Sequence, residues 1–269
     1  MASALPRPHD LPFLEGVRRQ ADYWAILWAR TWRGVVASSF LSPFLYVLAM
    51  GVLLGGFVEA DPDQLEGATS YLAFVVPGLI AAHAMQTAVS ETTYPVMGMI
   101  KWQRTYESML ATPLQARHVV GAHLGSVALH LAATCGLYTL VMAPFGVFES
   151  WWGPFLAFAS QVLTGMAFAT LVYAFTTRLY SEEGFGVLFR LGVFPLFLFS
   201  GAFFPVSNLG GGAWVARLTP LWHGVNLSRM FALDNVTWWL AGVNVAVLVA
   251  VLLLGWRWAV SGLAKRMLS

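Results

Sequence analysis

The sequence has few charged residues. Asp, Glu, Lys and Arg make up 10% of its 269 residues and hydrophobic residues make up 58%, whereas a typical soluble domain carries about 25% charge. So few charges cannot cover the surface of a 29.4 kDa globular protein with a mean hydropathy of +0.67, which argues against a soluble protein. The net charge is only +2 and no run of Lys or Arg occurs, so nucleic-acid binding is not expected.

Cysteine and lysine are scarcer still. The single cysteine, Cys135, excludes an internal disulfide and a cluster of thiolate metal ligands. A phosphate-binding loop requires Gly-Lys-Ser/Thr, but Lys101 follows Ile100 and Lys265 follows Ala264. We therefore expect the chain to hold no catalytic residue, cofactor or metal, and to hydrolyse no ATP. The first 33 residues contain five arginines and no apolar core, so no cleaved signal peptide is expected.

Long uncharged runs, by contrast, are frequent. A membrane-spanning helix needs about 20 predominantly apolar residues. Windows without Asp, Glu, Lys or Arg cover residues 34–58, 67–90, 118–148, 150–177, 191–216 and 235–256. They predict an all-α integral membrane protein with a single transmembrane domain over residues 1–269. The six predicted transmembrane helices cover approximately residues 35–58, 69–92, 118–142, 152–177, 184–204 and 236–258.

The distribution of basic residues predicts the orientation in the membrane, because cytoplasmic segments carry an excess of Lys and Arg. All but Arg217 and Arg229 of the 15 Lys and Arg residues fall in the N-terminal segment, the loop after the second span, the turn after the fourth span or the tail. Six spans with this bias place both termini in the cytoplasm of a multi-pass protein of the cytoplasmic membrane. The tryptophans that fit an aromatic belt at the outer edge are Trp151, Trp152, Trp214, Trp222, Trp238 and Trp239.

Residues 13–33 precede the first predicted span and repeat apolar residues at spacings of three and four. The apolar face carries Leu14, Val17, Ala21, Trp24, Trp28 and Trp32, and the other face carries Glu15, Arg18, Arg19, Asp22, Arg30 and Arg33. This pattern predicts an amphipathic helix in the membrane interface. Its interface residues are expected to be Arg18, Arg19, Trp24 and Trp28. The helix could serve only as an anchor, or its polar face could bind a cytoplasmic partner.

The loop after the second predicted span is longer than a minimal connection between two helices. Pro95 opens a helical pattern and Thr112-Pro113 ends it, so residues 94–114 are predicted to form a cytoplasmic segment with its own helix. Its mixture of Lys, Arg, Trp, Tyr and Glu is typical of a protein contact. A solvated loop helix is the alternative.

The histidines give only a weak indication of a metal or proton-relay site. His123 and His130 are seven residues apart and could share a helical face. No carboxylate lies between Arg117 and Glu149 to complete such a site. Packing or interface roles are therefore favoured for these histidines.

The sequence lacks residues that two other kinds of membrane protein, an intramembrane protease and an ion-coupled transporter, usually need. Ser200-Gly201 resembles part of the Gly-x-Ser-Gly sequence of rhomboid proteases, but Leu198 replaces the first Gly and residues 235–256 contain no His to activate the serine. An ion-coupled transporter or channel stays open as an alternative. Such a protein usually needs acidic or basic groups inside the membrane, and only Arg190 and Glu91 approach that position.

The apolar stretch 196–214, LFLFSGAFFPVSNLGGGAW, is broken by Gly and Pro. Together with LTPLWHGVNLSRMF, residues 218–231, it resembles the permease subunits of type 2 ABC exporters, in the branch of nodulation protein J and the daunorubicin exporters. The matching positions are Ser200, Gly201, Phe203, Pro205, Leu209, Pro220, Leu221, His223 and Arg229. YESMLATPL, residues 106–114, is similar to the cytoplasmic loop of the same family. The three glycines at 210–212 depart from the family, which often has a Leu-Pro-like turn there.

The resemblance implies an exporter built from two permease copies, expected to be a homodimer, and two copies of an ABC ATPase subunit that binds ATP and Mg. It implies outward transport of an amphipathic cargo: a glycolipid, lipo-oligosaccharide, polysaccharide or drug. Closure of the ATPases would be passed on through the N-terminal helix and the 94–114 loop. The expected ATPase-coupling residues are Trp102, Arg104, Tyr106 and Glu107.

The resemblance also gives the broken helix a role. Backbone groups freed by Gly201 and Pro205 cannot face lipid without a hydrogen-bond partner. A re-entrant outer hairpin over residues 205–233, between spans five and six, is therefore expected rather than an ordinary helix cap. The expected outer gate and cargo path consist of Phe199, Ser200, Gly201, Phe203, Phe204 and Pro205.

Overall fold

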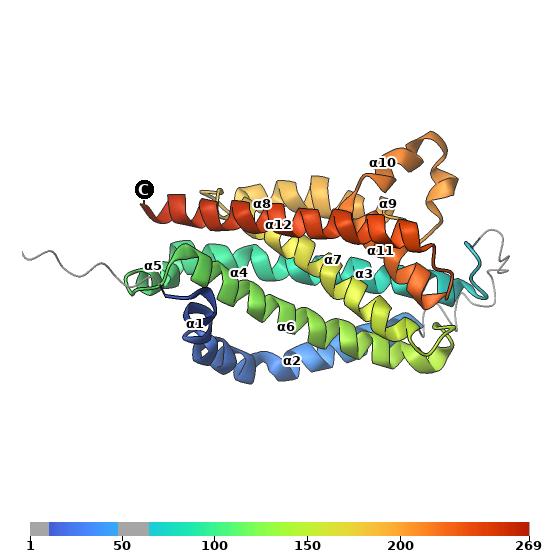
Figure 1. Cartoon of the computed structure of the whole chain (residues 1–269), viewed down its shortest axis with the longest axis horizontal. Coiled ribbons are helices and arrows are strands. Elements are labelled where there is room, and N and C mark those ends of the chain that lie inside the picture. Colours follow the sequence, from blue (N-terminus) through green and yellow to red (C-terminus); the bar gives the residue numbers. More distant parts are fainter. Residues whose placement is uncertain (1–10, 48–64, 269) are drawn as a thin grey trace, which may run out of the picture.

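The computed structural model describes residues 11–47 and 65–268, and every regular element within these ranges is a helix. The long helices lie side by side, roughly along the long axis of the molecule (Figure 1). They are α2 (Ala21–Val47), α3 (Tyr71–Thr92), α6 (Ala116–Met142), α7 (Gly153–Thr176) and α12 (Trp238–Leu268). The prediction of an all-α protein is confirmed for the described residues.

Four helices of the described chain are long and apolar enough to cross a membrane. They cover Tyr71–Trp102, Ala116–Phe145, Gly153–Thr176 and Trp238–Met267. All four exceed the ~20 residues that a membrane span requires. They agree with the second, third, fourth and sixth predicted spans, so the uncharged windows located these helices.

The first and fifth predicted spans are not among these four helices. The prediction for residues 35–58 falls partly outside the described residues, which include α2 as far as Val47. The prediction for residues 184–204 falls on a helical run of three short segments. These are α8 (Glu183–Val187), η4 (Leu188–Val193) and α9 (Phe194–Phe199). The count of six spans therefore stays a prediction.

The second span continues past its predicted end at residue 92. A bend at Thr93 (φ −95°, ψ −96°) joins α3 to α4 (Tyr94–Met97) and then to η2 (Gly98–Trp102), a wider helical turn. Pro95 does not end the helix, because it stands in the first turn of α4, where a missing N–H is tolerated. The span and the start of the predicted 94–114 loop therefore form one bent helix.

The rest of that loop contains a second helical piece. Arg104 adopts a left-handed conformation with φ +53° and starts a sharp turn. α5 (Thr105–Leu110) follows directly. The predicted single loop helix is thus divided at Arg104.

The N-terminal segment differs from the predicted single helix over residues 13–33. α1 (Phe13–Arg18) ends before a turn, and α2 then continues past residue 33 to Val47. Gln20 holds the turn, because its buried amide donates to the carbonyl oxygens of Gly16 and His118, both at 3.1 Å. The local apolar pattern does not reveal this contact between the turn and α6.

α7 packs against α3, α6, α12 and α11 (Pro220–Ala232). Small residues allow such close contact between membrane helices. A Cβ at Gly224 of α11 would lie 2.2 Å from Thr164 Oγ1, and a Cβ at Gly255 of α12 would lie 2.4 Å from Thr170 Oγ1. Larger residues at these two glycines would push α11 or α12 away from α7.

The two ends of the bundle differ. α1, α5 and the end of α12 gather at one end, and α10 (Ala213–Arg217) and α11 lie at the other (Figure 1). We call them the α5 end and the α11 end. The first and last described parts of the chain share the α5 end, as an even number of spans requires.

Candidate functional sites at the two ends of the bundle

The break in the apolar stretch lies at the α11 end. α9 ends at Phe199, and the chain then turns through residues 200–205, which we call the Gly201 turn. Gly201 has φ +85°, in the left-handed region that favours glycine. A Cβ at this position would also lie 2.6 Å from Val206 Cγ2. Both the backbone conformation and the space therefore require glycine here.

Arg229 of α11 holds the Gly201 turn from within the bundle. Its Nη2 donates to the carbonyl oxygen of Gly201 at 2.7 Å, and its Nε donates to the carbonyl oxygen of Phe74 at 3.1 Å. Its Nη1 forms an ion pair with Glu66 Oε2 at 2.9 Å, and its Cζ lies 3.8 Å from the centre of the Phe74 ring. Arg229 is only 4% exposed, so one buried cation joins three segments of the chain.

This role of Arg229 is not apparent from the sequence. There, Arg229 is a matching position of the family motif and one of two basic residues on the expected outer side. One signal was present: Arg229 is the single charged residue between Arg217 and Asp234. A lone charge in an otherwise uncharged stretch of a membrane protein is a candidate functional residue.

The other polar side chains of α11 are also paired inside the bundle. Nδ1 of His223 donates to Asn244 Oδ1 of α12 at 2.7 Å, and Asn244 Nδ2 donates to Asn226 Oδ1 at 2.8 Å. On another side of α11, Gln161 of α7 donates to the Ser228 hydroxyl at 3.0 Å. These bonds allow a helix with several polar residues to be buried among apolar helices.

The predicted gate residues lie at the end of α9 and in the Gly201 turn, and they differ in exposure. Ser200 and Pro205 are buried. Phe199 is 51% exposed, whereas Phe203 and Phe204 are half-buried. Phe199 therefore offers the largest surface of these residues to a ligand or to lipid.

Phe203 is anchored rather than free. Its ring packs edge-on against Phe197 of α9, with the ring centres 5.0 Å apart. Its carbonyl oxygen accepts from the Tyr71 hydroxyl at 3.2 Å. The Gly201 turn is thus tied to the start of α3 as well as to α11.

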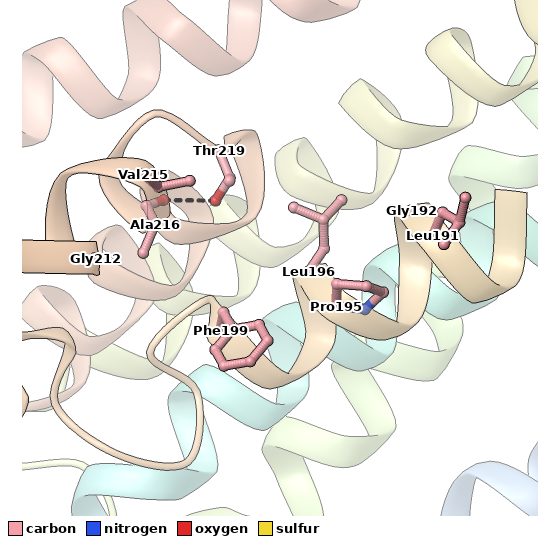
Figure 2. Close-up of a pocket in the computed structure, with 9 residues that line it drawn as sticks. All are labelled: Leu191, Gly192, Pro195, Leu196, Phe199, Gly212, Val215, Ala216 and Thr219. Atoms are coloured by element: carbon pink, nitrogen blue, oxygen red, sulfur yellow. Dashed lines mark hydrogen bonds between the residues drawn. The ribbon is translucent and has the colours of Figure 1, made fainter. Parts of the chain in front are cut away.

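An apolar groove of about 560 Å³ runs beside the Gly201 turn. Figure 2 shows η4 and α9 on one side of it and α10 on the other. Its lining consists of Leu191, Gly192, Pro195, Leu196, Phe199, Gly212, Val215, Ala216 and Thr219. The Thr219 hydroxyl donates to the Ala216 carbonyl oxygen at 2.7 Å, so this polar group is already engaged. Of the predicted gate residues, only Phe199 lines the groove.

At the α5 end, three of the four predicted ATPase-coupling residues lie on the surface. Trp102 is 56% exposed at the end of η2. Arg104 and Glu107 are exposed and paired, with Arg104 Nε 2.7 Å from Glu107 Oε2 and Arg104 Nη2 3.0 Å from Glu107 Oε1. Together they form a surface that carries an aromatic ring and both signs of charge.

Tyr106, the fourth coupling residue, points into the bundle. It is fully buried, and its hydroxyl lies 2.6 Å from Nδ1 of His123 in α6. Burial raises the pKa of Tyr106 well above its ordinary value, so the hydroxyl stays protonated and can donate. Tyr106 therefore attaches α5 to the bundle rather than extending the exposed surface.

A second ion pair lies near this surface. Lys101 Nζ is 3.1 Å from Glu182 Oε1, and both side chains are partly exposed. Hydrogen bonds from its own backbone N–H and from Lys101 hold the pKa of the Glu182 carboxyl below its ordinary value. The pair links the end of the bent second span to the turn before α8.

The predicted interface residues of the N-terminal segment divide between surface and bundle. Arg18 and Arg19 are exposed, and Arg19 pairs with Glu15 at 2.6 Å. Trp24 is 9% exposed and its ring centre lies 4.7 Å from that of His123. The centres of the Trp28 and His130 rings lie 5.7 Å apart. These two tryptophans therefore pack on α6.

The structure brings a carboxylate to the histidine face of α6 from another helix. His130 Nδ1 lies 3.1 Å from Glu91 Oε1 of α3, and His123 Nε2 lies 3.3 Å from the Glu91 carbonyl oxygen. Glu91 lies outside the stretch between Arg117 and Glu149, which contains no carboxylate, so the local sequence does not reveal this pair. No group of three His, Cys, Asp or Glu suited to a metal ion occurs among the described residues.

Comparison with known proteins gives a family and several relatives. The family described as ABC-2 type transporter matches residues 23–233. Nodulation protein J of Rhizobium leguminosarum bv. trifolii is 32% identical over 220 residues, covering 79% of this chain and 82% of that protein. Nodulation protein J of Rhizobium meliloti (strain 1021) is 31% identical with the same coverage. The inner membrane transport permease YadH of Escherichia coli (strain K12) is 25% identical over 224 residues, covering 76% and 77%. No solved structure matches the chain.

Proposed function

The chain belongs to the ABC-2 type transporter family, and on that basis we propose that it is the permease of an ATP-driven exporter. The observation that carries the proposal is the match over residues 23–233, together with relatives that include a transport permease. The sequence contains no Gly-Lys-Ser/Thr loop, so the energy would come from a separate ABC ATPase subunit that binds ATP and Mg.

Two copies of the ATPase subunit would bind at the α5 end. The exposed Trp102 and Arg104 support this location, because aromatic residues and Arg are enriched in protein interfaces. Glu107 is paired with Arg104 on the same surface. Tyr106 would hold α5 in place under the contact. The exposed Arg18 and Arg19 would add the N-terminal segment to the same surface.

We place the α5 end in the cytoplasm and the α11 end outside, in the cytoplasmic membrane. The bias of Lys and Arg toward the segments of the α5 end supports this orientation. α2, with residues beyond Val47, would form the first span, and the run α8–η4–α9 would form the fifth. The Gly201 turn, α10 and α11 would form a re-entrant outer segment. A second copy of the chain would complete a homodimeric pore.

The cargo would be amphipathic: a glycolipid, lipo-oligosaccharide, polysaccharide or drug. The apolar groove beside Phe199 supports this class, because its lining residues carry no charged side chain. Opening of the Gly201 turn would then release the cargo on the outer side.

An ion-coupled transporter is the second candidate function. The pair Glu91–His130, at 3.1 Å within two candidate spans, favours it, because ionisable groups inside the membrane often carry protons. The family match favours the ATP-driven exporter.

Transport in proteoliposomes separates the two functions. The chain and an ABC ATPase subunit that co-purifies with it would be reconstituted with labelled amphipathic cargos. We expect cargo transport that requires ATP hydrolysis and persists when an ionophore removes the proton gradient. Cargo transport that is driven by an imposed proton gradient and does not change when ATP is added would contradict the proposal and support the alternative.

A further inference from the structure

Pro95 leaves one carbonyl group of α3 without its helical partner. In an α-helix the carbonyl of residue 91 accepts from the N–H of residue 95, but proline has no N–H. Glu91 lies near the end of α3, inside the candidate span Tyr71–Trp102. Its carbonyl needs another donor, because lipid offers none.

Side chains from two neighbouring helices supply donors at this bend. His123 of α6 places Nε2 3.3 Å from the carbonyl oxygen of Glu91. Thr176 of α7 donates from its hydroxyl to the carbonyl oxygen of Thr92 at 2.8 Å. His123, Thr176 and Thr92 are all buried. The bend between α3 and α4 is therefore held by α6 and α7.

The other ring nitrogen of His123 binds α5. The Tyr106 hydroxyl oxygen lies 2.6 Å from His123 Nδ1. Since the carbonyl of Glu91 can only accept, Nε2 carries the proton of the neutral imidazole, and Nδ1 accepts from Tyr106. One imidazole thus connects the bend at Pro95 to the helix that follows it.

The same ring contacts two more helices. The ring of Trp24 in α2 lies 4.7 Å from it between centres, and the ring of Tyr173 in α7 lies 5.4 Å from it, both edge-on. His123 is 2% exposed and Tyr173 is fully buried. Trp24 follows the turn at Gln20, so the contact reaches the N-terminal segment.

From this arrangement we infer that His123 is a positioning residue that joins α5, the bend at Pro95 and the start of α2 into one unit. The inference rests on the proposed function, in which the α5 end binds the ATPase. Displacement of α5 then passes through Tyr106 and His123 to α3 and α2. His123 itself touches neither ATP nor cargo in this role.

Hydrogen–deuterium exchange on the full chain in lipid nanodiscs tests the unit without the ATPase. Tyr106→Phe removes one oxygen atom and keeps the ring. We expect amide exchange to rise about tenfold, the change that loss of one buried hydrogen bond can produce, in α5, in residues 93–98 and in residues 20–26. Tyr138→Phe removes a hydroxyl from another buried tyrosine, in α6, and should leave these segments unchanged.

A rise confined to α5 would overturn the inference, because Tyr106 would then anchor only its own helix. His123→Leu is the second variant. It removes the donor to Glu91 as well as the acceptor of Tyr106, so exchange in residues 93–98 should rise more than in Tyr106→Phe. Unchanged exchange at the bend in His123→Leu would also overturn the inference.

A transport measurement with the ATPase subunit separates this role from simple packing. We expect Tyr106→Phe to lower the amount of cargo moved per ATP hydrolysed, measured with enough permease to bind all of the ATPase subunit and at a temperature where the variant stays folded. An unchanged ratio would overturn the coupling role. If the unchanged chain moves no cargo with ATP, the proposed function fails, while the exchange data still decide whether His123 joins the three segments.

Discussion

Arg229 Nη2 donates to the carbonyl oxygen of Gly201 at 2.7 Å, across 28 positions of sequence. The same guanidinium binds the carbonyl of Phe74 and the carboxylate of Glu66. A buried charge is tolerated when its donors are paired, and here the partners are two backbone carbonyls and one carboxylate. The Gly201 turn is therefore held by the Arg229 guanidinium, which Phe74 and Glu66 keep in position.

Replacing Arg229 should open the Gly201 turn. Arg229→Leu leaves the carbonyls of Gly201 and Phe74 without their donor and Glu66 without its cation. We expect a loss of roughly 2–4 kcal/mol in the free energy of unfolding and a loss of export. Thermal unfolding in detergent and export in proteoliposomes measure the two effects.

Two further variants serve as controls for Arg229. Arg217→Leu removes an exposed arginine at the same end of the molecule and should change neither quantity measurably. Arg229→Lys keeps the charge, but a single ammonium cannot bind all three partners in the same geometry, so partial stability with weak export is expected. Full export by Arg229→Leu would show that the guanidinium is not needed to hold the turn.

Gly201→Ala tests the backbone of the same turn. The left-handed conformation costs a residue with a Cβ about 1–3 kcal/mol, and the new Cβ would lie 2.6 Å from Val206 Cγ2. We expect lower thermal stability and lower export. Val206 is itself buried, so Val206→Ala alone should also lower the stability. Because the second change removes the contact, the two losses should add to more than the loss in the double variant. Losses that simply add would mean that the contact with Val206 costs nothing.

The sequence was sufficient to predict the features that depend on local composition. Uncharged windows indicated four helices that the structure shows to be long and apolar enough to cross a membrane, because a membrane span must be apolar over most of its length. Glycine and proline indicated a break within residues 196–214, because glycine allows a left-handed backbone and proline has no N–H. α9 ends at Phe199, before the predicted end of the fifth span at residue 204.

The features that the sequence did not reveal depend on contacts between distant segments. The composition of the loop predicts Tyr106 as a residue of the ATPase contact. In the structure Tyr106 is buried and its hydroxyl meets His123, 17 positions later. The N-terminal segment turns at Gln20, whose side chain binds a carbonyl of α6, 98 positions away. Arg229 shows the same limit, since its partners Gly201, Phe74 and Glu66 lie 28, 155 and 163 positions away. Helical periodicity describes one element at a time and contains no information on such pairs.

Glu107→Lys tests the exposed surface at the α5 end. The change breaks the pair with Arg104 and places two cations side by side. An exposed ion pair contributes less than about 1 kcal/mol, so the thermal stability should hardly change. Binding of the ATPase subunit and ATP-driven export should both fall. Glu149→Lys makes the same change of charge at an exposed site outside this surface and should affect neither. Unchanged ATPase binding by Glu107→Lys would exclude this residue from the contact.

The purified chain should hydrolyse no ATP. No Gly-Lys-Ser/Thr sequence is present to hold the phosphates. Phosphate release should appear only after the ATPase subunit is added. A preparation shown by mass spectrometry to be free of other ATPases, yet releasing phosphate from ATP, would contradict the division into two subunits.

Filling the apolar groove tests the proposed cargo path. Gly192 lines the groove, and a Cβ there would lie 3.6 Å from Leu188 Cδ1, an ordinary contact. Gly192→Phe should therefore fold normally, with a stability change within about 0.5 kcal/mol, while its ring occupies part of the space of about 560 Å³. Export of a cargo with a long apolar chain should fall several-fold, and ATPase binding should stay unchanged.

Gly186→Phe is the matched control. Gly186 lies on the same helical run but does not line the groove, and a Cβ there would point into open space. Equal export by the two variants would show that cargo does not pass through this groove, since only one of the two added rings lies in it.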